Sequence, residues 1–211
     1  MVQRRSRRRS KVKIAFHVEG PSDFSILRTL VSRILNEEIE AMQYVRRSGG
    51  IDAVKSTIEN AVKYAWFQNA HGIIIVVDND YNPTHTSDHE HTSDPRCRYC
   101  LLHRLIPNLP ATPRSISPLK FGLGIAVQAI EAWLLFGARL VNRKYEQQPE
   151  LIRKEILKQR VYGSRVWKEE ISKPIAEGMD LQALAVAAPS FRLFRDSVLN
   201  FKTPLNPQVA G

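Results

Sequence analysis

The stretch GIIIVVDNDYNP, residues 72–83, decides which fold class the sequence indicates. Its first half is a run of Ile and Val that leads directly into Asp78, Asn79 and Asp80. A fully apolar, β-branched run is typical of a central strand in a parallel sheet, because such a strand is buried on both faces. We therefore predict a central strand here. The aspartates at its end either close the strand or belong to a functional site.

Helical and extended patterns alternate on both sides of this strand. Apolar residues spaced three or four positions apart predict helices, and short β-branched runs predict further strands. In the turn EGPSD, Ser22 or a neighbour can cap the first helix. This alternation predicts an α/β fold with a mostly parallel, Rossmann-like sheet. The expected order is strand 13–18, helix 23–35, strand 41–46, helix 51–68, strand 72–78, helix 97–106, strand 125–128 and a helix from residue 129.

The length of 211 residues allows one domain with a substantial core, or such a domain with a small appendage. The hydrophobic fraction of 43% and the charged fraction of 25% are those of a folded globular protein. We expect a basic, disordered tail over residues 1–12 and an α/β domain over residues 13–136, with an inserted loop at 79–95. Residues 137–211 show helical patterns without strand patterns, so we expect a helical C-terminal extension there.

Basic residues are concentrated near the start of the chain. The net charge is +10, and residues 1–13 hold seven Lys or Arg and no acid, which leaves +3 for the remainder. This tail either contacts the phosphates of nucleic acid or only solubilises the chain, and its composition does not separate the two. The candidate nucleic-acid-binding residues are Arg4, Arg5, Arg7, Arg8 and Arg9.

Three patterns bear on the cellular compartment. The sequence has no apolar run of 18 residues, so we expect no membrane span. The apolar segment after the basic start is too short for a secretion signal. Cys97 and Cys100 form a single CxxC pair rather than a secretory disulfide framework. We therefore expect a cytoplasmic protein.

Acidic residues follow three of the predicted strands. Glu19 comes just after the first strand, Asp78 and Asp80 close the central strand, and Glu131 opens the helix after the last one. The carboxyl ends of parallel strands share one edge of a sheet, where ligands bind, so these four carboxylates should converge. Close carboxylates repel one another, and a bound Mg²⁺ would remove the conflict. Each acid taken alone is better explained as a cap or a turn residue.

An ordered set of motifs carries a resemblance to a known family. VEGPSD at 18–23, followed by VVDND at 76–80, resembles the TOPRIM domain of topoisomerases, bacterial primases, recombination proteins, ribonuclease M5 and the OLD (overcoming lysogenisation defect) nucleases. The segments GIAVQAIEAWLLFG at 124–137 and PSFRLF at 189–194 are closer still to TOPRIM-like bacterial proteins of unknown function that are related to the OLD nuclease domain. The resemblance covers residues 13–137 well and the rest more loosely.

The resemblance implies an enzyme that cleaves phosphodiester bonds with Mg²⁺ or Mn²⁺. Glu19 matches the first metal-binding or acid/base glutamate of the family, and Asp78 and Asp80 match its DxD ligands. Glu131 matches the acid that OLD-like nucleases use for a second metal ion. Asp23 also matches the first motif, without a defined role.

A lysine and an asparagine complete the comparison with the family. Lys120 is the candidate for the lysine that OLD-like nucleases place on the phosphate, although a solvated loop lysine explains it as well. Many TOPRIM enzymes have a third acid where this chain has Asn82, and an amide oxygen gives the site less charge.

The leading hypothesis is therefore a DNA-cleaving nuclease of OLD-like type, acting in bacterial anti-phage defence with a separate ATPase, because the chain has no phosphate-binding P-loop of its own. A second copy of the chain is a further expected partner. One alternative is an RNA-processing nuclease that resembles ribonuclease M5. Another is a non-catalytic module that binds metal and nucleic acid.

A second constellation lies in HTSDHEHTSDPRCRYCLLH, residues 85–103. Cys97, Cys100, His103 and His91 (or His89) have the side chains of a tetrahedral Zn²⁺ site. The alternative is that the two cysteines pack as small apolar residues on one face of a short helix. Other residues are expected in the core, namely His17, Trp66, Phe67, Trp133, Phe136, Phe191 and Phe194.

Overall fold

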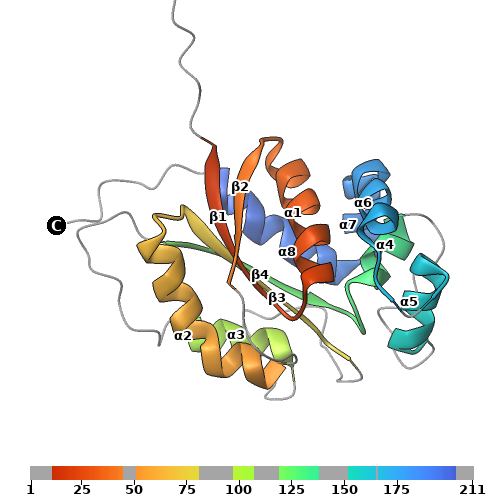
Figure 1. Cartoon of the computed structure of the whole chain (residues 1–211), viewed down its shortest axis with the longest axis horizontal. Coiled ribbons are helices and arrows are strands. Elements are labelled where there is room, and N and C mark those ends of the chain that lie inside the picture. Colours follow the sequence, from red (N-terminus) through yellow and green to blue (C-terminus); the bar gives the residue numbers. More distant parts are fainter. Residues whose placement is uncertain are drawn as a thin grey trace, which may run out of the picture.

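The computed structural model describes residues 11–44, 51–80, 97–106, 119–137, 152–164 and 166–202. In these ranges a four-stranded parallel sheet forms the centre, with helices on both of its faces (Figure 1). The α/β class is therefore confirmed, and the arrangement is consistent with a Rossmann-like fold. The strands are β1 (Val12–Val18), β2 (Ile39–Gln43), β3 (Gly72–Asp78) and β4 (Lys120–Ala126). The helices are α1 (Pro21–Leu35), α2 (Ile51–Phe67), α3 (Arg98–Leu105), α4 (Glu131–Gly137), α5 (Lys154–Tyr162), α6 (Glu169–Gly178), α7 (Leu181–Ala187) and α8 (Pro189–Leu199), and the 3-10 helix η4 (Asn200–Lys202) follows.

The strand order β2-β1-β3-β4 places the predicted central strand inside the sheet. Ile14 of β1 lies opposite Ala41 of β2 on one side and Gly72 of β3 on the other. The chain leaves β1 for one neighbour and later returns to the other. The strand order therefore reverses between the neighbouring strands β1 and β3. In open parallel sheets, ligands bind at the carboxyl ends of the strands at such a point.

The side chains of the sheet alternate between two cores. Ile14, Phe16, Ile74 and Val76 belong to a core shared with α1, α4 and the helices that follow them. Ala15, Ile73, Ile75 and Val77 belong to a core shared with α2 and α3. All seven residues of β3 are buried, as its unbroken apolar sequence predicts.

Helix α1 shows how local sequence sets an element boundary. Gly20 is the N-cap and Pro21 follows at the first helical position, where a missing N–H costs nothing. The prediction that the side chain of Ser22 or of a neighbour caps the helix was wrong, because no side chain makes a capping hydrogen bond. Ser22 lies inside the helix, and its hydroxyl donates to Asp23 Oδ1 at 3.1 Å. Asn36, at a φ of 52°, ends the helix.

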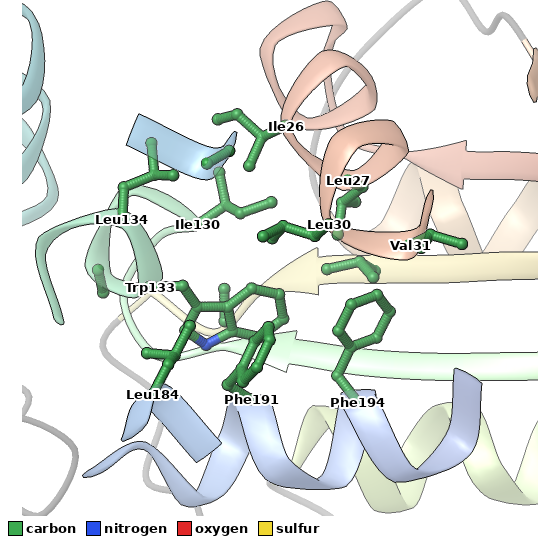
Figure 2. Packing of buried hydrophobic residues seen from close by; sticks show 14 of the residues in the cluster. Ile26, Leu27, Leu30, Val31, Ile130, Trp133, Leu134, Leu184, Phe191 and Phe194 are labelled. Carbon is green, nitrogen blue, oxygen red and sulfur yellow. The ribbon is translucent and has the colours of Figure 1, made fainter. Parts of the chain in front are cut away.

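The helices after residue 137 share the main core of the sheet. Figure 2 shows Trp133 of α4 between the labelled residues of α1 and the aromatic rings of α8. Its ring stacks on Phe194 at a centroid distance of 5.3 Å and meets Phe191 edge-on at 5.4 Å. The expected boundary at residue 137 thus does not separate two hydrophobic cores.

Strand β4 differs from its prediction because glycines obscured it. It begins at Lys120 and ends at Ala126, so the expected strand over 125–128 was wrong at both ends. A Cβ atom on Gly124 would lie 2.8 Å from Cδ2 of Phe194, so only glycine lets α8 pack this closely on the strand. The glycines that weaken the strand pattern in the sequence are therefore the residues that allow α8 to pack on β4.

Most aromatic residues lie where the sequence predicts. Trp133, Phe136, Phe191 and Phe194 are buried, and His17 is fully enclosed. The prediction for Phe67 was wrong, because its side chain is 70% exposed at the end of α2. None of the helices in the described part of the chain has the length and apolar character needed to cross a membrane.

Candidate functional site

The acidic residues meet at the carboxyl edge of the sheet, where the neighbouring strands β1 and β3 end. Glu19 directly follows β1 and Asp78 is the last residue of β3. Oε1 of Glu19 accepts a hydrogen bond from the backbone N–H of Asp78 at 3.1 Å. Burial raises the pKa of Glu19, and the charge of Asp78 raises it further. The two strand ends are therefore joined by the first predicted ligand.

Asp78 is the most enclosed carboxylate at the end of β3. It is 6% exposed, and its Oδ1 accepts a hydrogen bond from the backbone N–H of Ile130 at 3.1 Å, just before α4 begins. Its Oδ2 lies 2.5 Å from Nζ of Lys154. Burial raises the pKa of Asp78, while Lys154 opposes that shift. Asp78 thus has a structural role before α4 and also faces a cation.

Asp80 lies just beyond the strand in a strained backbone. Its φ is 47°, and it forms an isolated bridge with Gln128, whose φ is 63°. Residues other than glycine rarely adopt such angles, and they concentrate at functional sites. Oδ1 of Asp80 lies 3.3 Å from Nζ of Lys154, and its Oδ2 accepts from Arg98 at 2.9 Å. The bridge joins Asp80 to the segment between β4 and α4.

Glu131 and Asp23 form the buried side of the cluster. Glu131 is 1% exposed and its Oε1 accepts from the hydroxyl of Tyr162 at 3.3 Å. Its Oε2 is buried without a hydrogen-bond partner in the described part of the chain. Burial and the charge of Asp78 raise the pKa of Glu131. Burial, followed by the charges of Asp78 and Glu131, raises the pKa of Asp23 to about 8. Asp23 therefore belongs to the site.

Three cations at this edge were not predicted from the sequence. Lys154 and Lys158 come from α5, and Arg98 comes from the start of α3. Arg98 also donates to the backbone carbonyl of Asp78. The charge of Lys158 lowers the pKa of Asp78 and of Glu131. The spacing of four residues between the lysines predicts a shared helix face, but nothing local in the sequence connects that face to β3.

Lys120 lies at the opposite edge of the sheet and does not join the site. It pairs with Gly72 at the start of β3, whereas the carboxylates follow the end of that strand. Six residues of strand separate the two ends, or roughly 20 Å. Its Nζ donates to the carbonyls of Asn200 and Phe201, each at 3.1 Å. Lys120 is also not a loop lysine, because it is the first residue of β4 and its ammonium group binds carbonyl groups after α8.

We expect Lys120→Met to leave the chemistry of the site unchanged. The variant loses two hydrogen bonds from a cation to helix-terminal carbonyls, so the free energy of unfolding should fall by about 1 kcal/mol. Urea unfolding measures this change, and metal binding measured on the same variant should match the unmodified chain. A large loss of metal affinity in a folded Lys120→Met variant would contradict the placement of Lys120 outside the site.

The predicted zinc ligands in the described ranges differ in their exposure to solvent. Cys97 and Cys100 are buried and form no disulfide, whereas His103 is exposed and stacks on Tyr99. Burial raises the pKa of the Cys97 thiol in the metal-free chain. The burial of both cysteines agrees with the packing alternative, and the zinc site stays a prediction because His89 and His91 lie outside the described residues. His91, Asn82 and the basic residues Arg4, Arg5, Arg7, Arg8 and Arg9 lie outside the described ranges.

The donor atoms around β3 fit a hard divalent cation. They are carboxylate oxygens, which Mg²⁺ and Mn²⁺ prefer, and Glu131 Oε2 adds a buried oxygen that accepts no hydrogen bond in the described part of the chain. In the arrangement seen here, no three His, Cys, Asp or Glu among the described residues form a ready-made metal group. The cations that face Asp78 and Asp80 are instead Lys154 and Arg98. The chemistry of the donor atoms suits a divalent cation, but the carboxylates would have to move closer together, and Lys154 away from Asp78, before they could hold one.

No family model matches this chain, and no curated protein or solved structure matches it either. A functional proposal for the chain must therefore depend on the chemistry of the site and on the motif resemblance. The site combines buried carboxylates, a type of ligand for divalent cations, with nearby lysine and arginine side chains, a type of ligand for anionic groups.

The raised pKa of Asp23 gives a testable dependence of stability on pH. Its pKa in the folded chain is about 8, above its ordinary value of 3.8, so the folded chain binds the proton more tightly than the unfolded chain. The resulting penalty grows as the pH rises from about 4 to 8 and is absent at lower pH. Asp23→Asn cannot ionise. With EDTA present, we expect it to be more stable than the unmodified chain by about 1–3 kcal/mol at pH 9, and by much less at pH 5.

Urea unfolding of both proteins at the two pH values measures this difference. The matched control is Asp52→Asn, which removes an exposed carboxylate from the first turn of α2. Its stability relative to the unmodified chain should not rise between pH 5 and pH 9. If the difference for Asp23→Asn were the same at both pH values, the burial of an ionisable Asp23 beside Asp78 would be contradicted.

Proposed function

We propose that this chain is a divalent-metal-dependent nuclease with a TOPRIM-like catalytic domain, similar to the OLD-like nucleases. The observation that supports the proposal is the convergence of Glu19, Asp78 and Glu131 at the edge where the strand order reverses. Three separate elements bring these carboxylates together. Burial raises the pKa of each of the three carboxyl groups above its ordinary value. Such a cluster of buried carboxylates destabilises the folded chain unless a cation or a proton neutralises its charge.

Specific residues would hold the metal ions. Glu19, Asp78 and Asp80 would bind a first Mg²⁺ or Mn²⁺, and Glu131 with Asp23 would bind a second. When bound, such ions stabilise charge on the leaving oxygen and lower the pKa of an attacking water. At neutral pH Asp23 is largely protonated in the metal-free chain, because its pKa is about 8. Its carboxyl group would therefore release a proton as a cation binds.

The neighbouring cations would bind the scissile phosphate. Lys154 from α5 and Arg98 from α3 both contact the aspartates at the end of β3, so a phosphodiester at this edge would meet both positive groups. Lys154 would thus take the role that the resemblance gives to a lysine on the phosphate. Arg98 can form two parallel hydrogen bonds with phosphate oxygens, which fixes the orientation of the group.

DNA is the proposed substrate, on the basis of the resemblance to OLD-like nucleases. The same resemblance leads us to propose a role in bacterial anti-phage defence with an ATPase as a separate subunit. The basic residues of positions 1–13 would add affinity for any nucleic acid, since each neutralised phosphate releases counterions.

A panel of substrates tests the activity. The purified chain is incubated with supercoiled plasmid, single-stranded DNA and structured RNA, in Mg²⁺, Mn²⁺ or EDTA. We expect cleavage of DNA with either metal, no cleavage in EDTA, and recovery after excess Mn²⁺ is added back. Cleavage that persists in EDTA, or cleavage of no substrate in either metal, would contradict the proposal.

A second candidate is a non-catalytic module that binds nucleic acid. The observation that favours it is that Lys154 and Arg98 already neutralise Asp78 and Asp80, so the cluster can serve as an ion-pair network without a metal. Retention of DNA in a gel-shift assay without cleavage in any metal would favour this candidate.

A further inference from the structure

The ammonium group of Lys154 bridges the two aspartates of the DxD motif. Its Nζ lies 2.5 Å from Oδ2 of Asp78 and 3.3 Å from Oδ1 of Asp80. The side chain of Asp78 is 7% exposed and that of Lys154 is 25% exposed, so water screens this pair only partly. A charge-assisted contact of this kind is stronger than an exposed ion pair, and removing one partner leaves the other charge buried.

A divalent cation that binds the same carboxylates cannot share this position with Lys154. A metal ligand must lie in direct contact with its ion, and Oδ2 of Asp78 already contacts the ammonium group. Two cations held by one pair of carboxylates would also lie within a few ångströms and repel strongly in a site with little water. Binding of one therefore requires departure of the other.

We propose that Lys154 acts as the resident cation of the metal-free site and competes with the divalent ion for Asp78 and Asp80. This inference rests on the proposed function of the site. Lys154 sets the metal affinity of the chain, because its ion pairs must break before the ion binds. It is the first residue of α5, on a long and flexible side chain, so it can leave the aspartates without a change in the sheet.

Displacement gives Lys154 a second role. Once it leaves the aspartates, its charge remains at the edge and can pair with a phosphate of the substrate. Metal binding would thus free a cation for nucleic acid. By thermodynamic linkage, a nucleic acid that pairs with Lys154 would raise the affinity for the metal by the same factor. The site would then load metal preferentially when substrate is present.

Lys158 provides a matched control on the same helix. It lies one turn after Lys154, and its charge also lowers the pKa of Asp78. In the described part of the chain it acts on Asp78 through its charge at longer range, whereas Lys154 also makes a direct contact. Removal of either lysine takes one positive charge from α5, but only removal of Lys154 vacates the position between the aspartates.

The test measures Mn²⁺ binding without nucleic acid, by electron paramagnetic resonance of the free ion. We expect Lys154→Gln to bind Mn²⁺ about tenfold more tightly than the unmodified chain, because one partly buried ion pair no longer competes. Lys158→Gln should change the affinity by about twofold at most, as expected for a charge acting at longer range. Lys154→Arg should bind more weakly than the unmodified chain, because a guanidinium group pairs with two carboxylates more firmly than an ammonium group.

The outcomes separate the inference from the proposed function. Equal or weaker Mn²⁺ binding by a folded Lys154→Gln would overturn the competition and leave the metal site standing. If Lys154→Gln does not fold, Lys154→Arg decides, and equal or tighter binding would overturn the inference. If neither the unmodified chain nor Lys154→Gln binds Mn²⁺ at millimolar concentrations, both the inference and the metal-dependent function fail. Normal Mn²⁺ binding without cleavage of any nucleic acid would contradict the nuclease activity alone.

Discussion

Replacement of Asp78 by Asn should lower the rate of metal-dependent DNA cleavage by at least about 100-fold. Asp78 connects several parts of the site: its carboxylate contacts Lys154 and accepts from the N–H of Ile130, and its own backbone N–H donates to Glu19. The amide removes the charge that would bind the cation. Initial rates of plasmid nicking, measured over a range of Mn²⁺ concentrations, give the size of the loss.

The choice of Asn keeps this variant interpretable. Its side-chain oxygen can still accept the N–H of Ile130, so the start of α4 should be preserved, whereas alanine would lose that hydrogen bond. Circular dichroism and urea unfolding check that the variant is folded. Glu59→Gln, which removes an exposed carboxylate of α2, should cleave DNA at the unmodified rate. A folded Asp78→Asn variant that nicks plasmid as fast as the unmodified chain would contradict the role of Asp78.

Replacement of Trp133 by Ala should lower the free energy of unfolding by about 3–5 kcal/mol. The side chain is fully buried, its ring packs on Phe191 and Phe194, and its indole N–H donates to Ser190 at 2.9 Å. The variant loses apolar burial, leaves a cavity where α1, α4 and α8 meet, and removes that hydrogen bond (Figure 2). For a chain of this size the melting temperature should fall by about 10 °C or more.

Phe67→Ala is the matched control for this prediction. It also truncates an aromatic side chain, but that side chain is 70% exposed, so its stability should stay within about 0.5 kcal/mol of the unmodified chain. Differential scanning calorimetry of the three proteins compares the two losses. Equal melting temperatures for Trp133→Ala and Phe67→Ala would contradict a core that α4 and α8 share with the sheet.

Local sequence was sufficient for the features that depend on burial of a single element. The run of Ile and Val in β3 predicts a central strand, because a strand with apolar side chains on both faces is stable only when both faces are buried. Glu19, Asp78 and Glu131 could be placed at one edge because parallel strands end on the same side of a sheet. These predictions used chain direction and periodicity, which are both local.

The features that the sequence did not reveal depend on contacts between distant segments. Gly122 and Gly124 interrupt the apolar pattern that would predict β4. In the folded chain each glycine lets a neighbouring side chain pack closely on the strand, namely Ile74 of β3 at Gly122 and Phe194 of α8 at Gly124. The sequence predicts Lys120 to lie just before a strand that begins at residue 125, but the strand begins at Lys120 itself, five residues earlier. Lys154 and Arg98 reach the site from helices whose position depends on tertiary packing, so no spacing in the sequence relates them to Asp78.

A crystal of the chain soaked in Mn²⁺, with data collected at the manganese absorption edge, tests the central claim most directly. We expect an anomalous peak at the carboxyl edge of the sheet, in direct contact with carboxylate oxygens of Glu19 and Asp78, and with Nζ of Lys154 moved away from Asp78. An ordered site without a peak, with Lys154 still bound to Asp78 at saturating Mn²⁺, would contradict it.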